Sequence, residues 1–269
     1  MDIDVVEMED KKAKLILSGI SPSVANAIRR ALISDIPKMA IDNVEFHLGP
    51  IRDEHGKEYE SATPLFDEII SHRLGLIPIY TDLELFVFKE DCVCKGEGCP
   101  NCTIMYSLNK KGPFEEEGEE GVTVYSDELQ LVVQKIEGLS EKKYAEKFQI
   151  KEKIPIVKLS KNQALLLYAT AELGTGRDHA KWQVTQAVGY QFYPQIEIDH
   201  EKCDMGTSCV KNCPNDVLAV KDNKIEVADI ESCSLCKTCE EVCSSDSIKV
   251  SGDESKYIFQ FETDGSMTA

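Results

Sequence analysis

Basic residues are scarce in this sequence of 269 residues. Lysine and arginine number 30 against 48 aspartates and glutamates, which gives a formal net charge of -18 at pH 7. Nonspecific affinity for nucleic acid comes from clustered lysines and arginines that displace counterions from phosphates. The chain is therefore not expected to wrap a nucleic-acid backbone by itself, and other subunits would have to make such contacts.

Long apolar stretches are also missing. No run of eighteen apolar residues occurs, and the N-terminus is charged from Asp2 onward, so neither a membrane span nor a signal peptide is expected. These absences predict a cytoplasmic protein. A content of 42% hydrophobic and 29% charged residues predicts an ordinary soluble chain of one to three domains.

Signatures of catalysis are absent as well. No G-x-G-x-x-G follows a predicted strand, and no Cys/His or Ser/His/Asp group offers a nucleophile. His179 lies beside Asp178 and close to Lys181, but a lone histidine in such a place more often has a structural hydrogen-bonding role. The sequence therefore predicts no catalysis by this chain alone.

What the sequence does contain is eleven cysteines in three tight clusters. Without an export signal, such spacing favours metal thiolates over disulfides. Two half-motifs, CDMGTSCVKNCP from Cys203 and CSLCKTCEEVC from Cys233, resemble a two-cluster bacterial ferredoxin, in which the fourth cysteine of each half ligates the other half's cluster. That crossover predicts one complete 4Fe-4S ligand set: Cys213, Cys233, Cys236 and Cys239.

The second iron–sulfur site is incomplete, because Gly206 stands where the pattern expects a cysteine. The remaining thiols are Cys203, Cys209 and Cys243. Three thiolates suit a 3Fe-4S cluster or a 4Fe-4S cluster with one iron held by another group, and an empty site is a further alternative. The ferredoxin spacing argues against cysteines that are merely buried or that bind zinc.

The middle cluster supplies four soft ligands within eleven residues: Cys92, Cys94, Cys99 and Cys102. Gly96 and Gly98 allow the chain to turn tightly between the pairs. Four thiolates without a histidine or an open position are typical of a closed, structural zinc site. We expect this site to stabilise a loop module that is too small to hold a core.

Elsewhere the pattern predicts alternating strands and few helices. Residues 12–20 predict a strand, and a helix is expected from Ser21, a candidate N-cap, with Pro22 in its first position and Pro37 beyond its end. Its apolar face comprises Val24, Ala27, Ile28, Ala31 and Leu32. An amphipathic segment is expected at 66–79 and an acidic solvated loop at 115–120. Further strands are expected at 39–49, 121–126, 129–134, 188–198 and 257–262, and β texture at 154–174 around a turn or helical start at 160–163. Because β segments flank the C-terminal cysteines, their module is expected to be inserted into a larger sheet.

Three stretches, SVANAIRRALISDIPKMAIDNVEF, FDEIISHRLGLIPI and GTGRDHAKWQ, resemble the family of the archaeal RNA polymerase D subunit, relatives of the eukaryotic third-largest subunit and of the bacterial α amino-terminal domain. The likeness spans nearly the whole chain, and some archaeal members carry a ferredoxin-like insertion. It implies an α+β fold of the RNA polymerase α type. The implied parts are a discontinuous dimerisation domain at 1–46, 154–198 and 254–269, a β-rich inserted domain with the zinc-type cluster at 47–153, and a ferredoxin-like 4Fe-4S domain at 199–253.

The resemblance also implies a function and partners. The chain would be a noncatalytic assembly subunit of DNA-directed RNA polymerase, paired with the L subunit to form a platform for the large catalytic subunits. The helix at 21–36 would pack against its counterpart in the L subunit, so that its apolar residues face either the core or the partner. Candidates for contact with the large subunits are Arg29, Arg30, His72 and Arg73.

Two alternatives accompany this interpretation. A ferredoxin-type electron-transfer protein would explain the iron–sulfur motifs, but no flavin or nicotinamide fingerprint accompanies them. The clusters of a polymerase subunit could either stabilise their module or make assembly sensitive to oxidation. Family members usually continue into a long C-terminal helix where this sequence stops at Ala269, so a short member or a truncated sequence is expected, without the helix that completes the family's dimer interface.

Overall fold

The computed structural model describes residues 1–52, 56–113, 121–133 and 140–269, and its fold is α+β. The chain divides into two compact units. The first comprises residues 1–31, 187–262 and 269, and the second comprises residues 32–186 and 263–268. The acidic loop expected at 115–120 lies outside the described residues. In the described part of the chain, no helix combines the length and apolarity needed to cross a bilayer.

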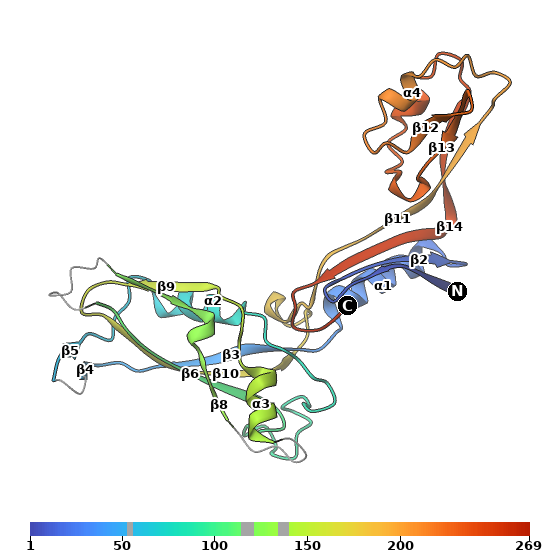
Figure 1. The fold of residues 1–269 in the computed structure, drawn as a ribbon. Helices are drawn as coiled ribbons and strands as arrows, with labels where there is room; N and C mark the ends of the chain where they lie inside the picture. The colour runs from blue at the N-terminus through green and yellow to red at the C-terminus, as the bar shows by residue number, and fades with distance from the viewer. Residues whose placement is uncertain (53–55, 114–120, 134–139) are drawn as a thin grey trace. The chain divides into compact units, whose positions relative to one another are not determined.

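A four-stranded sheet forms the base of the first unit, with the strand order β1-β2-β14-β11 (Figure 1). The strands are β1 (Asp2–Met8), β2 (Lys12–Ser18), β14 (Ile248–Thr263) and β11 (Thr185–Ile198). β2 pairs antiparallel with β1 on one side and with β14 on the other. The strands predicted at 12–20, 188–198 and 257–262 are confirmed.

β1 has no counterpart among the predicted strands. Its pairing with β2 shifts register between Val5 and Glu7, so one residue of β1 is extra to the ladder. A bulge of this kind breaks the alternation of apolar and polar residues that identifies a half-buried strand. Ile3, Val5 and Val6 are all exposed, so β1 contributes little to the core of the sheet.

Helix α1 (Pro22–Ser34) confirms the predicted helix. It begins after Ser21, whose carbonyl oxygen accepts hydrogen bonds from the N–H groups of Val24 and Ala25 at 3.0 and 3.1 Å. Proline suits the first helical position because its missing N–H would have no partner there. Ala25 is buried.

The C-terminal cysteine module lies between β11 and β14, which are neighbours in the sheet, as the sequence predicted (Figure 1). Its elements are α4 (Ser208–Lys211), β12 (Leu218–Lys221), β13 (Lys224–Val227), η4 (Ile230–Ser232) and α5 (Thr238–Glu241). β12 and β13 form an antiparallel hairpin. The small core of the module mixes aliphatic side chains with thiols: Cys209, Val217, Leu218, Ile225, Cys233, Cys239, Ile248 and Val250.

The second unit is built on a sheet of order β3-β10-β6-β8. Its strands are β3 (Lys38–Phe46), β10 (Ala164–Gly174), β6 (Thr103–Lys111) and β8 (Gln130–Val132). Helix α2 (Asp67–Gly75) corresponds to the predicted amphipathic segment, and its buried Ile70 and Leu74 join the core of the sheet. The predicted β texture at 39–49 and 154–174 is confirmed.

Smaller elements complete the second unit. They are β4 (Ile51–Arg52), β5 (Glu58–Tyr59), β7 (Val122–Tyr125), η2 (Ser126–Glu128), α3 (Glu141–Phe148), β9 (Pro155–Leu159) and η3 (Ala180–Trp182). Neither β6 nor α3 was among the predicted elements. α3 buries Tyr144 and Phe148, and the Tyr106 hydroxyl of β6 donates to the Phe148 carbonyl oxygen at 2.8 Å.

Close packing of an indole against a glycine gives a first testable prediction. A methyl group added at Gly174 would lie 2.3 Å from Cε2 of Trp182, whose Nε1 donates to the Glu172 carbonyl oxygen at 3.1 Å. Because the ring must move, Gly174→Ala is expected to lower the free energy of unfolding by about 1–3 kcal/mol. Urea unfolding followed by the emission of the single tryptophan measures this.

The control is Gly189→Ala in β11, because a methyl group there meets no atom within 4 Å. Its free energy of unfolding should stay within about 0.5 kcal/mol of the wild-type value. Equal stability of the two variants would contradict the packing argument.

Candidate metal centres

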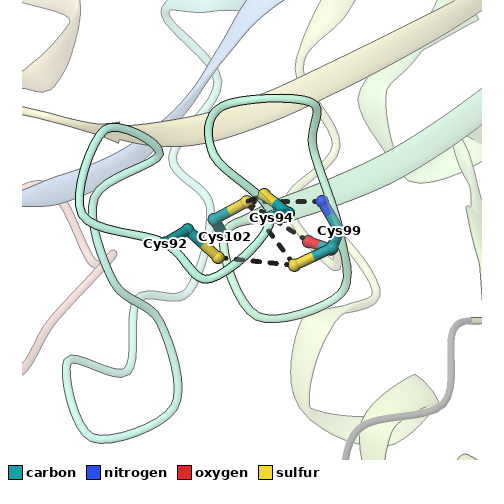
Figure 2. Close-up of side chains that lie close together, drawn as sticks. All are labelled: Cys92, Cys94, Cys99 and Cys102. Atoms are coloured by element: carbon teal, nitrogen blue, oxygen red, sulfur yellow. Dashed lines mark hydrogen bonds between the residues drawn. The ribbon is translucent and has the colours of Figure 1, made fainter.

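Four cysteines of one loop converge in the second unit, as Figure 2 shows. Their sulfur atoms all lie within 4.8 Å of one another. The Sγ–Sγ distances are 3.4 Å for Cys92 and Cys99, 3.6 Å for Cys94 and Cys102, and 3.9 Å for Cys99 and Cys102. The structure thus brings together the four residues that the sequence predicted as a zinc-type set.

The backbone between the cysteine pairs enters the left-handed region at three residues, of which Lys95 has a φ of 56°. Gly96 has a φ of +86° and Gly98 a φ of +94°, which residues with a Cβ rarely adopt. On either side, the Cys92 carbonyl oxygen accepts from the N–H of Lys95, and the Cys99 carbonyl oxygen accepts from the N–H of Cys102, both at 2.9 Å. These turns direct the four thiols toward one point.

The sulfur spacing fits a tetrahedral metal ion. A zinc ion bonded to four sulfurs at about 2.3 Å places neighbouring sulfurs about 3.8 Å apart, close to the distances in the loop. A disulfide would need about 2.05 Å, and all four cysteines are unpaired. The donor set therefore suits zinc or a similar thiophilic ion and has no open coordination position for catalysis.

The thiols of this loop have unlike acidities. Burial raises the pKa of the Cys94 thiol, but hydrogen bonds from the Gly98 backbone and from neighbouring sulfurs outweigh it and lower the value to about 6. Burial raises the pKa of Cys102. Lys89, which forms an ion pair with Glu172 at 3.0 Å, has a raised pKa because of that carboxylate and, to a lesser extent, the Cys102 thiolate.

Lys89 was not among the predicted site residues. Four thiolates around a divalent ion leave two negative charges, and a nearby ammonium group offsets part of them. A lysine three residues before a cysteine cluster carries no sequence signal of this role. Only the fold brings it within electrostatic range of Cys102.

In the first unit, a cavity gathers four cysteines from both ferredoxin-like half-motifs. Its walls include Cys213, Cys233, Cys236 and Cys239, and the aliphatic side chains of Ile196, Val217, Leu218 and Val250 line much of the rest. Cys233 and Cys239 are each 7% exposed, whereas Cys236 is exposed. Four thiols around one largely apolar cavity fit a 4Fe-4S cluster, and they are the set that the crossover predicted.

Electrostatics also connects these thiols. Burial raises the pKa of Cys239, and the charges of Cys213, Cys233 and Cys236 raise it further. Hydrogen bonds from Thr238 lower the pKa of the exposed Cys236. Cys213 therefore lies within electrostatic range of the other half-motif's cysteines, as the crossover requires.

Backbone amides support the fourth cysteine of each half-motif. The N–H of Val217 lies 3.4 Å from the Cys213 sulfur, and the N–H of Ser247 lies 3.3 Å from the Cys243 sulfur. Amide donors of this kind stabilise thiolates and tune iron–sulfur clusters. From β11, Gln191 donates to the Cys233 carbonyl oxygen at 3.0 Å, which fixes the loop of the second half-motif to the sheet.

The three cysteines of the incomplete set also come together. Burial raises the pKa of Cys209, which is 2% exposed, and the charges of Cys243 and Cys203 add to the effect. Hydrogen bonds from Ser247 and Ser245 lower the pKa of Cys243 to about 7. The three thiols therefore lie within electrostatic range of one another, and their role as cluster ligands stays a prediction.

The predicted partner residues lie at the surface. Those of the apolar face of α1 are exposed or half-buried: Val24, Ala27, Ile28, Ala31 and Leu32. Arg29 donates from Nε and Nη2 to Asn26 Oδ1 at 3.1 and 2.9 Å, and Arg30 is exposed. The face of α1 that carries Val24 and Ala27 therefore does not pack into the core.

Two further candidates lie in the second unit. His72 and Arg73, in the last turn of α2, are exposed, and Arg73 Nη1 donates to the Ile156 carbonyl oxygen at 2.6 Å. His179 accepts a hydrogen bond at Nδ1 from the N–H of Lys181 at 3.1 Å. This contact agrees with the structural role predicted for that histidine.

Comparisons with known proteins cover the whole chain. A family model described as the RNA polymerase Rpb3/RpoA insert domain matches residues 53–199. The DNA-directed RNA polymerase subunit Rpo3 of Picrophilus torridus is 40% identical over 267 residues, which cover 99% of this chain and 91% of that protein. The subunit of the same name from Thermoplasma volcanium is 41% identical over 269 residues, covering 100% and 91%. That of Methanosphaera stadtmanae is 38% identical, covering 99% and 90%.

Proposed function

The chain belongs to the family of the archaeal DNA-directed RNA polymerase subunit Rpo3, also called the D subunit, and from this membership we propose that it is a noncatalytic assembly subunit of the polymerase. The observation that carries the proposal is the match along almost the full length to proteins that bear this name. As such a subunit it acts in the cytoplasm, within a nucleotidyltransferase complex whose catalytic residues lie on other chains. The net charge of -18 agrees with a position away from nucleic acid.

Its direct partner in this proposal is the L subunit. The apolar residues of α1 that the core leaves uncovered would pack against the partner's corresponding helix, with Ala27 and Ala31 allowing close approach. Val24 is 41% exposed, and pairing would remove this apolar surface from water, which favours the heterodimer. Arg29, Arg30, His72 and Arg73 are the proposed contacts with the large subunits.

The domain organisation proposed for this role is the discontinuous one. Residues 1–46, 154–198 and 254–269 form the dimerisation domain, residues 47–153 the inserted domain, and residues 199–253 the ferredoxin-like domain. The cavity with four cysteines supports the ferredoxin-like part of this organisation, and the cysteine loop of the second unit supports the metal site of the inserted part. We assign 4Fe-4S to Cys213, Cys233, Cys236 and Cys239, and zinc to Cys92, Cys94, Cys99 and Cys102.

In this proposal the metal centres have a structural role. Metal binding by a small module adds directly to its folding free energy. The electron-transfer alternative is not favoured, because the relatives that match along the full length are named as polymerase subunits.

Anaerobic co-expression with the L subunit, followed by size-exclusion chromatography, tests the proposal. The wild-type chain is expected to elute as a heterodimer containing zinc and iron. Ala27→Glu combined with Ala31→Glu places two charges on the exposed face of α1 and should abolish the heterodimer, because buried unpaired charges cost several kcal/mol each.

The matched control is Val220→Glu, at a 48% exposed position in β12. It should leave pairing unchanged. A wild-type chain that stays monomeric and reduces an external electron acceptor would instead support the electron-transfer alternative. Pairing of the double variant as tight as that of the wild type would contradict the assignment of the α1 face.

A further inference from the structure

The two ferredoxin-like half-motifs are an internal repeat in three dimensions as well as in sequence. Each cysteine of the second half lies thirty residues after its counterpart, as Cys203 and Cys233 illustrate. The backbone repeats with the same offset, because Met205 has a φ of 60° and Leu235 a φ of 58°. By this correspondence Gly206 is the counterpart of Cys236.

The Asp204 carboxylate lies beside the point where the side chain of a cysteine at position 206 would begin. A Cβ atom added at Gly206 would be 3.0 Å from Oδ1 of Asp204, and the same oxygen accepts the N–H of Gly206 at 3.0 Å. The Asp204 side chain therefore occupies the space beside the position from which Cys236 acts in the other half. The counterpart of Asp204 is Ser234, which has no carboxylate.

The second oxygen of this carboxylate reaches the other half-motif. Asp204 Oδ2 accepts a hydrogen bond from the hydroxyl of Ser244 at 2.9 Å, and Ser244 directly follows Cys243. On the remaining side, the Cys209 sulfur lies 4.0 Å from the Gly206 carbonyl oxygen. Asp204 is thus flanked by segments that carry all three thiols of the incomplete set.

Exposure follows the same pattern in both halves. In the complete set, Cys236 is exposed while the other three cysteines are buried or half-buried. In the incomplete set, Asp204 is exposed, whereas Cys203, Cys209 and Cys243 are buried or half-buried. A hydrated carboxylate is suited to the solvent-facing corner, and carboxylates are established iron ligands in proteins.

We propose that Asp204 is the fourth ligand of the second cluster, supplying a carboxylate oxygen in place of the thiolate that Gly206 lacks. The inference rests on the ferredoxin-like module of the proposed function. It selects, among the alternatives open at this site, a four-iron cluster with three sulfur ligands and one oxygen ligand from the protein.

The test uses the full chain co-expressed with the L subunit and kept anaerobic. Wild-type protein is expected to hold about eight irons in its ferredoxin-like module, and Asp204→Ala about seven. Electron paramagnetic resonance of the oxidised samples gives a second readout, because an oxidised three-iron cluster is paramagnetic and an oxidised four-iron cluster is not. Only Asp204→Ala should show the three-iron signal.

Combining Asp204→Ala with Gly206→Cys provides the rescue. The new thiol occupies the position of Cys236 in the repeat, and removal of the carboxylate gives its Cβ room. This variant should return to about eight irons and lose the three-iron signal, which also shows that the module still folds. Asp222→Asn, in the turn of the β12–β13 hairpin, is the control and should match the wild type.

The remaining outcomes overturn the inference. An Asp204→Ala variant with the wild-type iron content and no three-iron signal would exclude the carboxylate as a ligand. A three-iron signal or a content of about four irons in the wild type would do the same, while leaving the first cluster and the assembly role intact. Wild-type protein without any iron would contradict the ferredoxin-like module itself.

Discussion

Cys239→Ala is expected to release about four irons per chain and to destabilise the module between β11 and β14. Cys239 is 7% exposed and lines the cavity with the other three thiols of its set, so its loss removes a ligand from the centre of a small core. Five buried aliphatic residues share that core with three cysteines, so in the proposed function a bound cluster would contribute much of its stability. Iron and sulfide analysis measures the first effect, and limited proteolysis within residues 199–253 measures the second.

Two variants separate ligand loss from ordinary loss of packing. Ile225→Val removes one methylene from the same core, costs about 0.5–1.5 kcal/mol, and should keep every iron. Cys209→Ala, at the corresponding position of the first half-motif, should empty the second site and spare the first. Retention of all irons by Cys239→Ala would show that this cysteine is a packing residue and not a ligand.

Lys38→Met is expected to lower the free energy of unfolding of the second unit by about 3–5 kcal/mol. The Lys38 ammonium forms an ion pair with Asp264, and their side chains are 3% and 9% exposed. Its second contact is the Gln183 carbonyl oxygen at 3.5 Å. Removing the ammonium leaves a buried carboxylate whose remaining partners are the N–H and hydroxyl of Ser266.

A double-mutant cycle tests this explanation. Lys38→Met combined with Asp264→Leu leaves no unpaired charge, so the double variant should be markedly more stable than the sum of the single effects predicts. Lys142→Met is the surface control, because the Lys142–Glu146 pair has exposures of 87% and 66%. Its loss should cost less than about 0.5 kcal/mol in urea unfolding. Additive effects at Lys38 and Asp264 would contradict a coupled buried pair.

Features that depend on spacing along the chain could be predicted from the sequence. The four thiols of the loop at 92–102 are within eleven residues of one another, so the chain has little choice in bringing them together. Helix α1 was predictable for the same reason, since its start and its periodicity are local. The ferredoxin-like repeat likewise fixes which cysteines approach each other.

Features that depend on contacts between distant segments could not be predicted. Lys38 and Asp264 are 226 positions apart, and neither carries a local signal of burial. Lys89 pairs with Glu172 and comes within electrostatic range of Cys102 only because β10 passes beside the cysteine loop. Asp204 could have been noticed from the sequence by aligning the two half-motifs, but only its contacts with Gly206 and Ser244 give it a role.

The pairing of β2 with β14 also has a consequence during synthesis on the ribosome. Leu17 of β2 lies opposite Tyr257 of β14, so the two partners are some 240 residues apart. At elongation rates of about 5–20 residues per second, β2 waits on the order of tens of seconds for this neighbour. During that interval one edge of the β1–β2 hairpin has no native partner, and an unpaired edge can join strands of other chains. Nascent chains therefore have a period of aggregation risk that ends only when β14 leaves the ribosome.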